Sequence, residues 1–473
     1  MKKEPVQPKE QIVSKRIQSF DEVVSCYSED EAIGEASRCL QCAVASCASG
    51  CPVGIDIKKF IAEVCARDYA AAYRTIRQKN NFPSMCGRVC PAEYQCRRTC
   101  VFTKKGLSFA ASSAINIHFL ERFIGDWGLL HQASTVSAPA ARAPRVAVVG
   151  SGPAGLCCAG ELARAGIKVV IFESLHKLGG VLQYGIPAFR LPREILDVEI
   201  KNLEAMGVEF VTNFVVGRAC ALGDLFAQGF SAVFLGLGAG VPSFLGVPGE
   251  TLCNVYSANE FLTRINLMRA EQFPQFHTPV NIGKKVVVIG GGNTAIDSAR
   301  VALRLQKIRG FSPDTTLLYR RTETEMPARR LEIEHAKQEG VIFSFLVKPL
   351  LLRGAPDGFL KEITLLRCER GEPDQSGRRA PVDVPGSEYT LPCDVAVIAI
   401  GLRANRLLTA ATAMLTVDAY GDIIVNPDTM ETSIENVFAG GDIVGGEGTV
   451  IEAMGMAKRA AAAIIKRFAA KGD

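Results

Sequence analysis

The stretch 145–173, RVAVVGSGPAGLCCAGELARAGIKVVIFE, decides the fold of most of this chain. A short apolar run leads through a glycine-rich turn into an amphipathic run, and a second apolar run follows. Strand, helix and strand in this order predict a βαβ unit of a parallel sheet. The scheme repeats at 284–290 (KKVVVIG), 293–310 and 315–321 (TTLLYRR). We therefore expect two Rossmann-like dinucleotide-binding domains.

The first glycine turn has the spacing of a dinucleotide site. In GxGxxG, Gly150 permits a tight turn, Gly152 lets a pyrophosphate approach the backbone, and Gly155 lets helix and strand pack closely. Glu173, at the end of the second strand, is placed to accept hydrogen bonds from a ribose diol. The predicted binding residues of this turn are Gly150, Gly152, Pro153, Ala154, Gly155 and Glu173.

Features further along the chain favour FAD at this site. Gly180 follows Glu173 as in the extended FAD signature, and Gly441-Asp442 resembles the second motif of two-dinucleotide flavoproteins, where the Asp binds the ribityl chain. An Asp next to a Gly is also common in β-turns, so the FAD interpretation of Asp442 depends partly on the first fingerprint. Thr449 and Val450 begin a predicted helix whose N-terminal dipole stabilises negative charge on a flavin.

The second glycine turn lacks the acid that follows the first. It has the pattern GxGxxA, and the next strand ends in Arg320 and Arg321. An acid there repels a 2′-phosphate, whereas an arginine binds it bidentately, so we expect NADP(H). The alternative is that Arg320 and Arg321 are solvated surface residues. Arg329 and Arg330 lie nearby in the sequence and are further candidates. The predicted binding residues are Gly290, Gly292, Asn293, Thr294, Ala295, Arg320 and Arg321.

Eight of the sixteen cysteines crowd into two short stretches. One reads Cys-x2-Cys-x4-Cys-x3-Cys-Pro over 39–52, and the other Cys-x3-Cys-Pro-x4-Cys-x3-Cys over 86–100. Zinc usually takes two CxxC pairs and only one exists here, so iron–sulfur clusters are favoured over structural zinc. A flavin also converts the hydride of NADPH into the single electrons that clusters carry. The neighbouring Cys157 and Cys158 are expected to be core residues.

Charge and composition exclude several classes of protein. The 473 residues include 54 Lys and Arg and 49 Asp and Glu, a balance too even to indicate nucleic acid or an anionic membrane as partner. The N-terminus lacks the apolar core of a signal peptide, and the apolar runs are too short to span a bilayer. We expect a cytoplasmic protein.

Nearly the whole chain resembles one family. Its motifs are RCLQC…CPVGIDI, CGRVCP, GSGPAGL, YGIPAFRLP, GGGNTAID, YRRTETEMPA and FAGGDIVGGEGTV. They resemble the small (β) subunit of NADPH-dependent glutamate synthase and its relatives. These are the large subunit of NADH-dependent ferredoxin:NADP oxidoreductase, sulfide dehydrogenase and the N-terminal half of dihydropyrimidine dehydrogenase. The resemblance implies FAD, NADPH and two [4Fe–4S] clusters, with FAD and NADPH domains paired as in adrenodoxin reductase.

The resemblance also implies how the clusters are held. One cluster takes Cys39, Cys42, Cys47 and Cys100. The other takes Cys51, Cys90, Cys96 and a fourth ligand that is Gln or Glu in relatives; the run LERF places Glu121 at that position. An exposed helix Glu is the alternative for Glu121. Cys86 is then a spare cysteine, or it is the ligand if Glu121 is not.

The expected architecture is an α-helical [4Fe–4S] domain followed by two α/β Rossmann-like domains. Residues 1–142 form the helical domain, 143–250 with 395–473 the FAD domain, and 251–394 the NADP domain; 131–145 reads as a linker. The implied function passes electrons from NADPH through FAD and two clusters to a second redox subunit, most simply a glutamate synthase large subunit. The alternatives are a ferredoxin:NADP oxidoreductase, possibly flavin-bifurcating, with a smaller flavin/[2Fe–2S] subunit or ferredoxin as partner, a sulfide dehydrogenase subunit, or a non-catalytic scaffold stabilised by its clusters.

Overall fold

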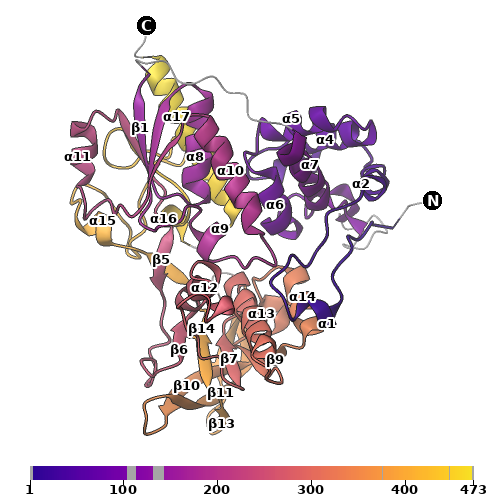
Figure 1. Cartoon of the computed structure of the whole chain (residues 1–473), viewed down its shortest axis with the longest axis vertical. Helices are drawn as coiled ribbons and strands as arrows, with labels where there is room; N and C mark the ends of the chain where they lie inside the picture. Colours follow the sequence, from indigo (N-terminus) through magenta and orange to yellow (C-terminus); the bar gives the residue numbers. More distant parts are fainter. Residues whose placement is uncertain (1–3, 104–112, 132–142, 375–376, 447, 471–473) are drawn as a thin grey trace.

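The computed structural model has three modules (Figure 1). A helical module lies beside a module built on one parallel sheet, and a module built on a second parallel sheet lies below them in this view. No helix of the described residues is long and apolar enough to cross a membrane. Most of the expected linker, 132–142, lies outside the described part. The structure describes residues 4–103, 113–131, 143–374, 377–446 and 448–470.

Short capped helices make up the helical module. Ser28 and Glu31 form a capping box at the start of α2, and Asp56 and Asp68 accept hydrogen bonds from the first turns of α4 and α5. Pro83 stands in the first turn of α6, where a missing N–H costs nothing. The elements are α1 (Val13–Arg16), α2 (Glu29–Ala36), α3 (Ser46–Ser49), α4 (Ile57–Cys65), α5 (Tyr69–Arg77), α6 (Pro83–Val89), η1 (Ala92–Tyr94), η2 (Val101–Thr103) and α7 (Ile117–His131).

The first sheet contains the βαβ unit expected from 145–173. Its strands are all parallel, in the order β16-β4-β1-β2-β3, and their side chains are largely buried. The elements are β1 (Arg145–Val149), α8 (Pro153–Arg164), β2 (Lys168–Phe172), α9 (Val181–Tyr184), α10 (Arg193–Ala205), β3 (Glu209–Val211), α11 (Leu222–Ala227), β4 (Ala232–Leu235), α15 (Leu407–Ala410), β16 (Val437–Ala439), α16 (Asp442–Gly445) and α17 (Val450–Ala469).

The second sheet is also parallel, in the order β6-β14-β7-β8-β9, and a small antiparallel sheet extends from it. Strands β5 and β15 pair where the chain passes between the modules. The elements are β5 (Ala239–Pro242), β6 (Val255–Ser257), α12 (Ala258–Asn266), η4 (Ala270–Gln272), β7 (Val286–Ile289), α13 (Asn293–Ile308), β8 (Thr315–Tyr319), η5 (Glu323–Glu325), α14 (Arg330–Glu339), β9 (Ile342–Phe345), β10 (Val347–Gly354), β11 (Leu360–Pro373), β12 (Arg379–Asp383), β13 (Tyr389–Pro392), β14 (Val395–Ile398) and β15 (Leu402–Ala404).

Strand β14 corrects one expected boundary. The sequence placed the return to the first domain before residue 395, but β14 lies between β6 and β7 in the second sheet. The chain returns only after this strand, through β15. A buried parallel strand has the same kind of apolar run whichever sheet it joins, so the run itself does not indicate the sheet.

One continuous apolar core joins the helical module to the first sheet and its helices. Gly455 of α17 faces the segment that follows Cys51, since a Cβ at Gly455 would lie 3.0 Å from the Pro52 carbonyl oxygen. On the same helix, the Met454 sulfur lies 3.6 Å from the Sγ of Cys86. The cysteine-bearing segments are therefore held directly against α17.

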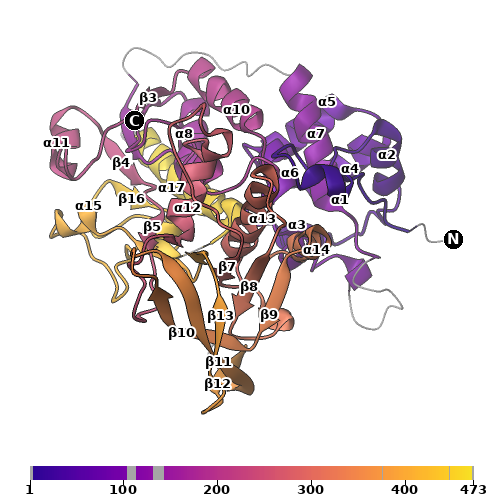
Figure 2. The same cartoon turned by 60° about the horizontal axis from the view of Figure 1, so that its bottom comes forward.

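Buried ion pairs attach the N-terminal arm, residues 9–25, to the second module. Arg16 of α1 is fully buried, with Nε 3.1 Å from Glu339 Oε1. Arg300 and Arg304 of α13 pair with the same carboxylate at 2.8 and 2.7 Å. Figure 2 shows α1 at the edge of the helical module, above α14 in this view.

We predict that Glu339→Gln destabilises the protein by about 3–5 kcal/mol, because it leaves three buried guanidinium groups without their shared carboxylate. Burial by itself raises the pKa of Glu339, but Arg300 and Arg304 outweigh it and lower this pKa from 4.5 to about 2. The contribution of this group to stability is therefore present above pH 4.5 and is lost as the pH falls towards 2. Thermal unfolding followed by circular dichroism measures the effect.

The matched control is Glu334→Gln on the same helix. Glu334 is more than half exposed and its ion pair with Lys337 spans 3.4 Å, so its loss should cost less than about 0.5 kcal/mol. Equal unfolding midpoints for the two variants would show that the buried cluster contributes no special stability.

Candidate functional site

The first glycine turn has the geometry that its spacing predicts. Gly150 has φ +97°, and a Cβ at Gly155 would lie 1.9 Å from the Gly150 carbonyl oxygen, so only glycine fits there. A Cβ at Gly152 would meet nothing within 4 Å. This open space lies at the N-terminus of α8, directly after Gly152, where backbone N–H groups favour an anion. The turn therefore has room for a pyrophosphate.

Glu173 fastens the turn to the end of β2. Its Oε2 accepts hydrogen bonds from the backbone N–H and the hydroxyl of Ser151, at 2.9 and 2.6 Å. The Ser151 hydroxyl in turn accepts one from the N–H of Gly179. Glu173 is buried, as a ribose-binding acid at this position must be.

The two predicted FAD motifs meet at Gly441, because a Cβ there would lie 3.1 Å from the Cβ of Ala154 in the first turn of α8. Asp442 accepts a hydrogen bond from the N–H of Gly448, and burial raises its pKa. Burial also raises the pKa of Tyr184 to about 12, and the carboxylates of Glu173 and Asp442 add to that rise. Segments far apart in the sequence therefore lie side by side here.

Thr449 is the N-cap of α17, as its sequence context predicts. Its hydroxyl accepts a hydrogen bond from the N–H of Glu452, and Glu452 Oε2 accepts one from the N–H of Thr449, which completes a capping box. Val450 is the first residue of the helix. The positive end of a 20-residue helix thus lies beside Asp442 and the first glycine turn.

The second glycine turn repeats the design of the first. Gly290 has φ +147°, and a Cβ there would lie 2.1 Å from the Ala399 carbonyl oxygen. A Cβ at Gly292 would meet nothing within 4 Å, so this turn also leaves open space before the N-terminus of its helix, α13. Asn293, Thr294 and Ala295 form the first turn of that helix.

The four arginines near this turn have different surroundings. Arg320 is exposed at the end of β8, where a 2′-phosphate group is expected. Arg321 is buried and pairs with Asp374. Arg330 is exposed, but Arg329 is buried and its Nη1 donates to the carbonyl oxygen of Arg88 in the helical module at 2.7 Å. The interpretation of Arg329 as a phosphate ligand is therefore wrong.

Four cysteines line one pocket of the helical module. They are Cys39, Cys42, Cys47 and Cys100, and the apolar residues of the lining include Ile57, Ile61 and Ile117. Burial raises the pKa of the Cys47 thiol to about 11, and Cys100 and Cys39 add to the rise because they lie nearby. The two cysteine stretches thus contribute to a single pocket.

The four remaining cysteines of the two stretches are Cys51, Cys86, Cys90 and Cys96. Burial raises the pKa of each thiol, and the Glu121 carboxylate adds to the rise in all four. Glu121 is itself buried in α7, and burial raises its pKa to about 8. A buried carboxyl beside these thiols fits a metal cluster, because a cation there stabilises the deprotonated groups.

Asn80 contacts both Glu121 and Cys86. Its Nδ2 donates to Glu121 Oε1 at 2.5 Å, and its Oδ1 lies 3.6 Å from the Cys86 sulfur. The sequence analysis missed Asn80, because one asparagine between two helices carries no motif. It also missed Ser151, although that residue lies inside the first fingerprint.

The spacing of the thiols bears on the kind of metal site. Among the described residues, no three His, Cys, Asp or Glu side chains converge as the ligands of a single metal ion do. Four ligands of one zinc ion all lie about 2.0–2.3 Å from a common centre. Each thiolate of a [4Fe–4S] cluster binds a different iron, so its ligands need not converge on one point.

Two family models together match most of the chain. "Dihydropyrimidine dehydrogenase domain II, 4Fe-4S cluster" matches residues 16–133. "Pyridine nucleotide-disulphide oxidoreductase" matches residues 144–460. The small chain of NADPH glutamate synthase from Escherichia coli is 34% identical over 97% of this chain and 96% of its own length.

The chain belongs to the family of the NADPH glutamate synthase small chain. Members include the small chain of NADPH glutamate synthase from Azospirillum brasilense, 32% identical over 98% of this chain and 95% of its own length. The β subunit of the NADP⁺-dependent formate dehydrogenase of Moorella thermoacetica is 40% identical over 89% of this chain and 59% of its own length. The chain is accordingly an oxidoreductase that uses FAD, NADPH and [4Fe–4S] chemistry.

Solved structures agree on the fold of the two sheet modules. FprA from Mycobacterium tuberculosis, in its complex with NADPH, matches with a TM-score of 0.58 and 24% identity, over 70% of this chain and 86% of its own. At this identity the likeness shows a shared fold.

The two inner glycines of the first turn give a matched pair of variants. Gly152→Ala should leave thermal stability unchanged but weaken FAD binding roughly tenfold (about 1.4 kcal/mol), because its methyl group fills the space open to the pyrophosphate. Gly155→Ala should destabilise the fold itself, since its Cβ overlaps the Gly150 carbonyl oxygen. Unfolding midpoints and the ratio of released flavin to protein measure the two effects. A Gly152→Ala protein with wild-type flavin affinity would contradict this placement of FAD.

Proposed function

We propose that this chain carries electrons from NADPH, through FAD and two [4Fe–4S] clusters, to a partner redox subunit. In this proposal residues 1–142 hold the clusters, the module of the first sheet holds FAD and that of the second holds NADPH. Bound FAD supplies the conversion between the two electrons of a hydride and the single electrons of clusters. The residues of the chain bind and orient these groups.

One chain of contacts carries the proposal. Gln95 directly precedes Cys96 in the sequence, and its Oε1 is 3.1 Å from the Cys90 sulfur. Its Nε2 donates to the hydroxyl of Thr449 at 3.4 Å. Thr449 caps the helix whose positive end faces the FAD site. A single side chain therefore connects the proposed flavin site to the nearer set of cysteines.

We assign the nearer cluster to Cys51, Cys90, Cys96 and Glu121, and the farther one to Cys39, Cys42, Cys47 and Cys100. The nearer set lies against α17, while the farther set lines its own pocket. Exposed Leu40 and Val44 stand between the farther cysteines in the sequence. The farther cluster is thus the one that faces a partner.

The proposed partner is the large subunit of a glutamate synthase, because the small chains of that enzyme match this chain over nearly their whole length. The β subunits of a formate dehydrogenase and of an NADPH-Fe(3+) oxidoreductase, the latter 37% identical, favour a different acceptor subunit as the second candidate. Co-purification of the native protein distinguishes the two. None of the sixteen cysteines, all of which lie in the described residues, forms a disulfide bond. This fits the reducing cytoplasm that we propose as the location of the protein.

The coenzyme test replaces the exposed arginine of the second site. Arg320→Ala should raise the KM for NADPH roughly 10- to 100-fold, since a lost charged hydrogen bond costs about 1.5–3 kcal/mol. The KM for NADH should stay unchanged, because NADH lacks the 2′-phosphate. Anaerobic stopped-flow reduction of the bound flavin measures both. An Arg320→Ala protein that prefers NADPH as strongly as wild type refutes the assignment.

The ligand test compares Glu121 with Cys86. If Glu121 is the ligand, Glu121→Cys should keep a cluster and raise its potential, because a soft thiolate replaces a hard carboxylate. Cys86→Ser should then leave both clusters nearly unchanged. EPR of the reduced proteins with iron analysis measures this. Loss of a cluster in Cys86→Ser, with both clusters intact in Glu121→Ala, assigns the fourth ligand to Cys86 instead.

A further inference from the structure

Arg329 connects the second nucleotide turn to the helical module. Its backbone N–H donates to Asn293 Oδ1 at 2.9 Å, and Asn293 is the first residue of α13. Its guanidinium Nη1 donates to the carbonyl oxygen of Arg88 at 2.7 Å. Arg88 is in the last turn of α6, two residues before Cys90. One residue therefore joins the start of α13 to a cysteine-bearing loop.

The contact with Arg88 acts as a cap for α6. The last carbonyl groups of a helix have no partner within it, and they carry the negative end of the helix dipole. A cation that donates to such a carbonyl stabilises the helix end. Here the cation comes from a different module, about 240 residues further along the chain. The end of α6, and with it Cys90, is thus positioned by the second module.

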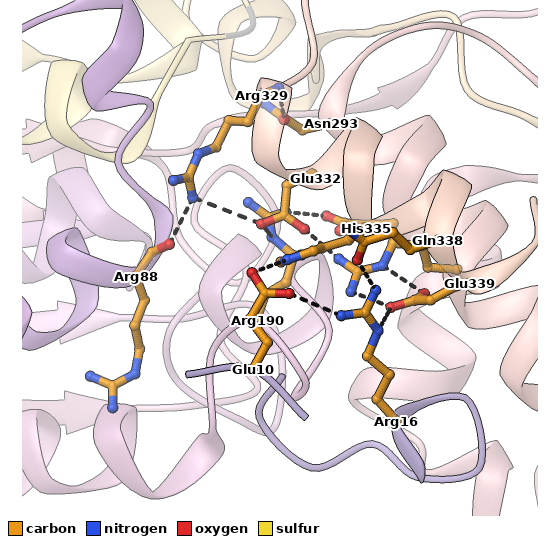
Figure 3. A network of polar contacts seen from close by, with 12 residues as sticks. Glu10, Arg16, Arg88, Arg190, Asn293, Arg329, Glu332, His335, Gln338 and Glu339 are labelled. Carbon is orange, nitrogen blue, oxygen red and sulfur yellow. Dashed lines mark hydrogen bonds and ion pairs between the residues drawn. The ribbon is translucent and has the colours of Figure 1, made fainter. Parts of the chain in front are cut away.

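The charge of Arg329 is only loosely balanced. The carboxylates nearest to its guanidinium belong to Glu93 and Glu332, at 3.8 and 3.9 Å. Glu332 is held more closely by Arg190 and Arg300. The Nε of Arg329 is buried and has no hydrogen-bond partner among the described residues. Figure 3 shows the guanidinium group apart from the crowded ion pairs around Glu339, reaching towards Arg88.

The Arg329 charge lies beside the nearer set of cysteines. Its guanidinium is buried and donates to the carbonyl oxygen of Arg88, two residues before Cys90 in the chain. The buried His118 one turn before Glu121 has its pKa lowered by burial and next by Arg329. A positive charge in a protein interior favours the more negative of two redox states of a neighbouring group.

We propose that Arg329 is a positioning residue that fixes the Cys90 loop to the start of α13 and raises the reduction potential of the cluster beside it. This inference rests on the proposed assignment of that cluster to Cys51, Cys90 and Cys96. It gives the second module a role in the redox properties of the helical module. The exposed Arg330 next to it lacks this position.

The test is an EPR-monitored redox titration of the anaerobically purified holoprotein. In Arg329→Gln the ratio of reduced to oxidised nearer cluster, at a fixed potential, should fall roughly 3- to 10-fold, a shift of about 30 to 60 mV. Arg329→Lys keeps the charge and should stay near the wild-type potential. The signal that is lost in Cys96→Ser identifies the nearer cluster, and the farther cluster serves as an internal reference.

Two further variants complete the design. Lys337→Gln removes one surface charge from α14, which begins next to Arg329, and it should leave both potentials unchanged. Arg329→Met is a second neutral variant that leaves no polar end in the protein interior. If neither neutral variant assembles its clusters while Arg329→Lys assembles both at wild-type potentials, a positive charge is required at this position and the proposal stands.

Three results overturn the proposal. The first is an intact nearer cluster with an unshifted potential in a neutral variant, and the second is an equal shift of both clusters. The third is a shift in Arg329→Lys as large as in Arg329→Gln. A wild-type protein without iron–sulfur signals would instead refute the proposed function itself, on which this inference depends.

Discussion

The contact between α17 and the helical module is the constraint on which the proposed sites depend. The helix has its N-cap at Thr449, beside the proposed FAD site, and one turn later Met454 and Gly455 contact Cys86 and Pro52. Only a small residue permits this approach, because a Cβ at Gly455 would lie 3.0 Å from the Pro52 carbonyl oxygen. The apolar core that stabilises the two modules therefore also determines how close the cysteines lie to the proposed FAD site.

The second module is attached by buried ion pairs as well as by apolar packing. Arg16 pairs with Glu339, and Arg190 pairs with Asp297 and Glu332. Val23 of the arm and Phe189 pack in the apolar core of this module. Buried pairs contribute little net stability against apolar packing, but each partner left alone is costly. Such an interface is therefore stable only when the charged groups keep their relative positions. Through Arg329 it connects the second nucleotide turn to the end of α6.

Much of the fold followed from local patterns. Glycine spacing, apolar strands and capping residues are written in short segments, so both βαβ units and the start of α17 at Thr449 were predictable. The boundary near residue 395 was not, since β14 enters a sheet that its own sequence does not specify. Arg329 was misplaced for a related reason. Its sequence neighbours suggested a phosphate site, whereas its partner is a backbone carbonyl of the helical module.

The sequence by itself determined the types of site: two glycine turns that differ in the acid or arginine after them, and two runs of thiols with the spacing of clusters. These are local properties, because turn geometry and ligand type depend on residues close together in the chain. Only the tertiary structure decided which distant groups meet. It brought Gly441 against Ala154, put Asn80 in contact with both Glu121 and Cys86, and set Gln95 between Cys90 and Thr449. Those contacts depend on how the modules pack, and side-chain packing across modules leaves no periodic mark in the sequence.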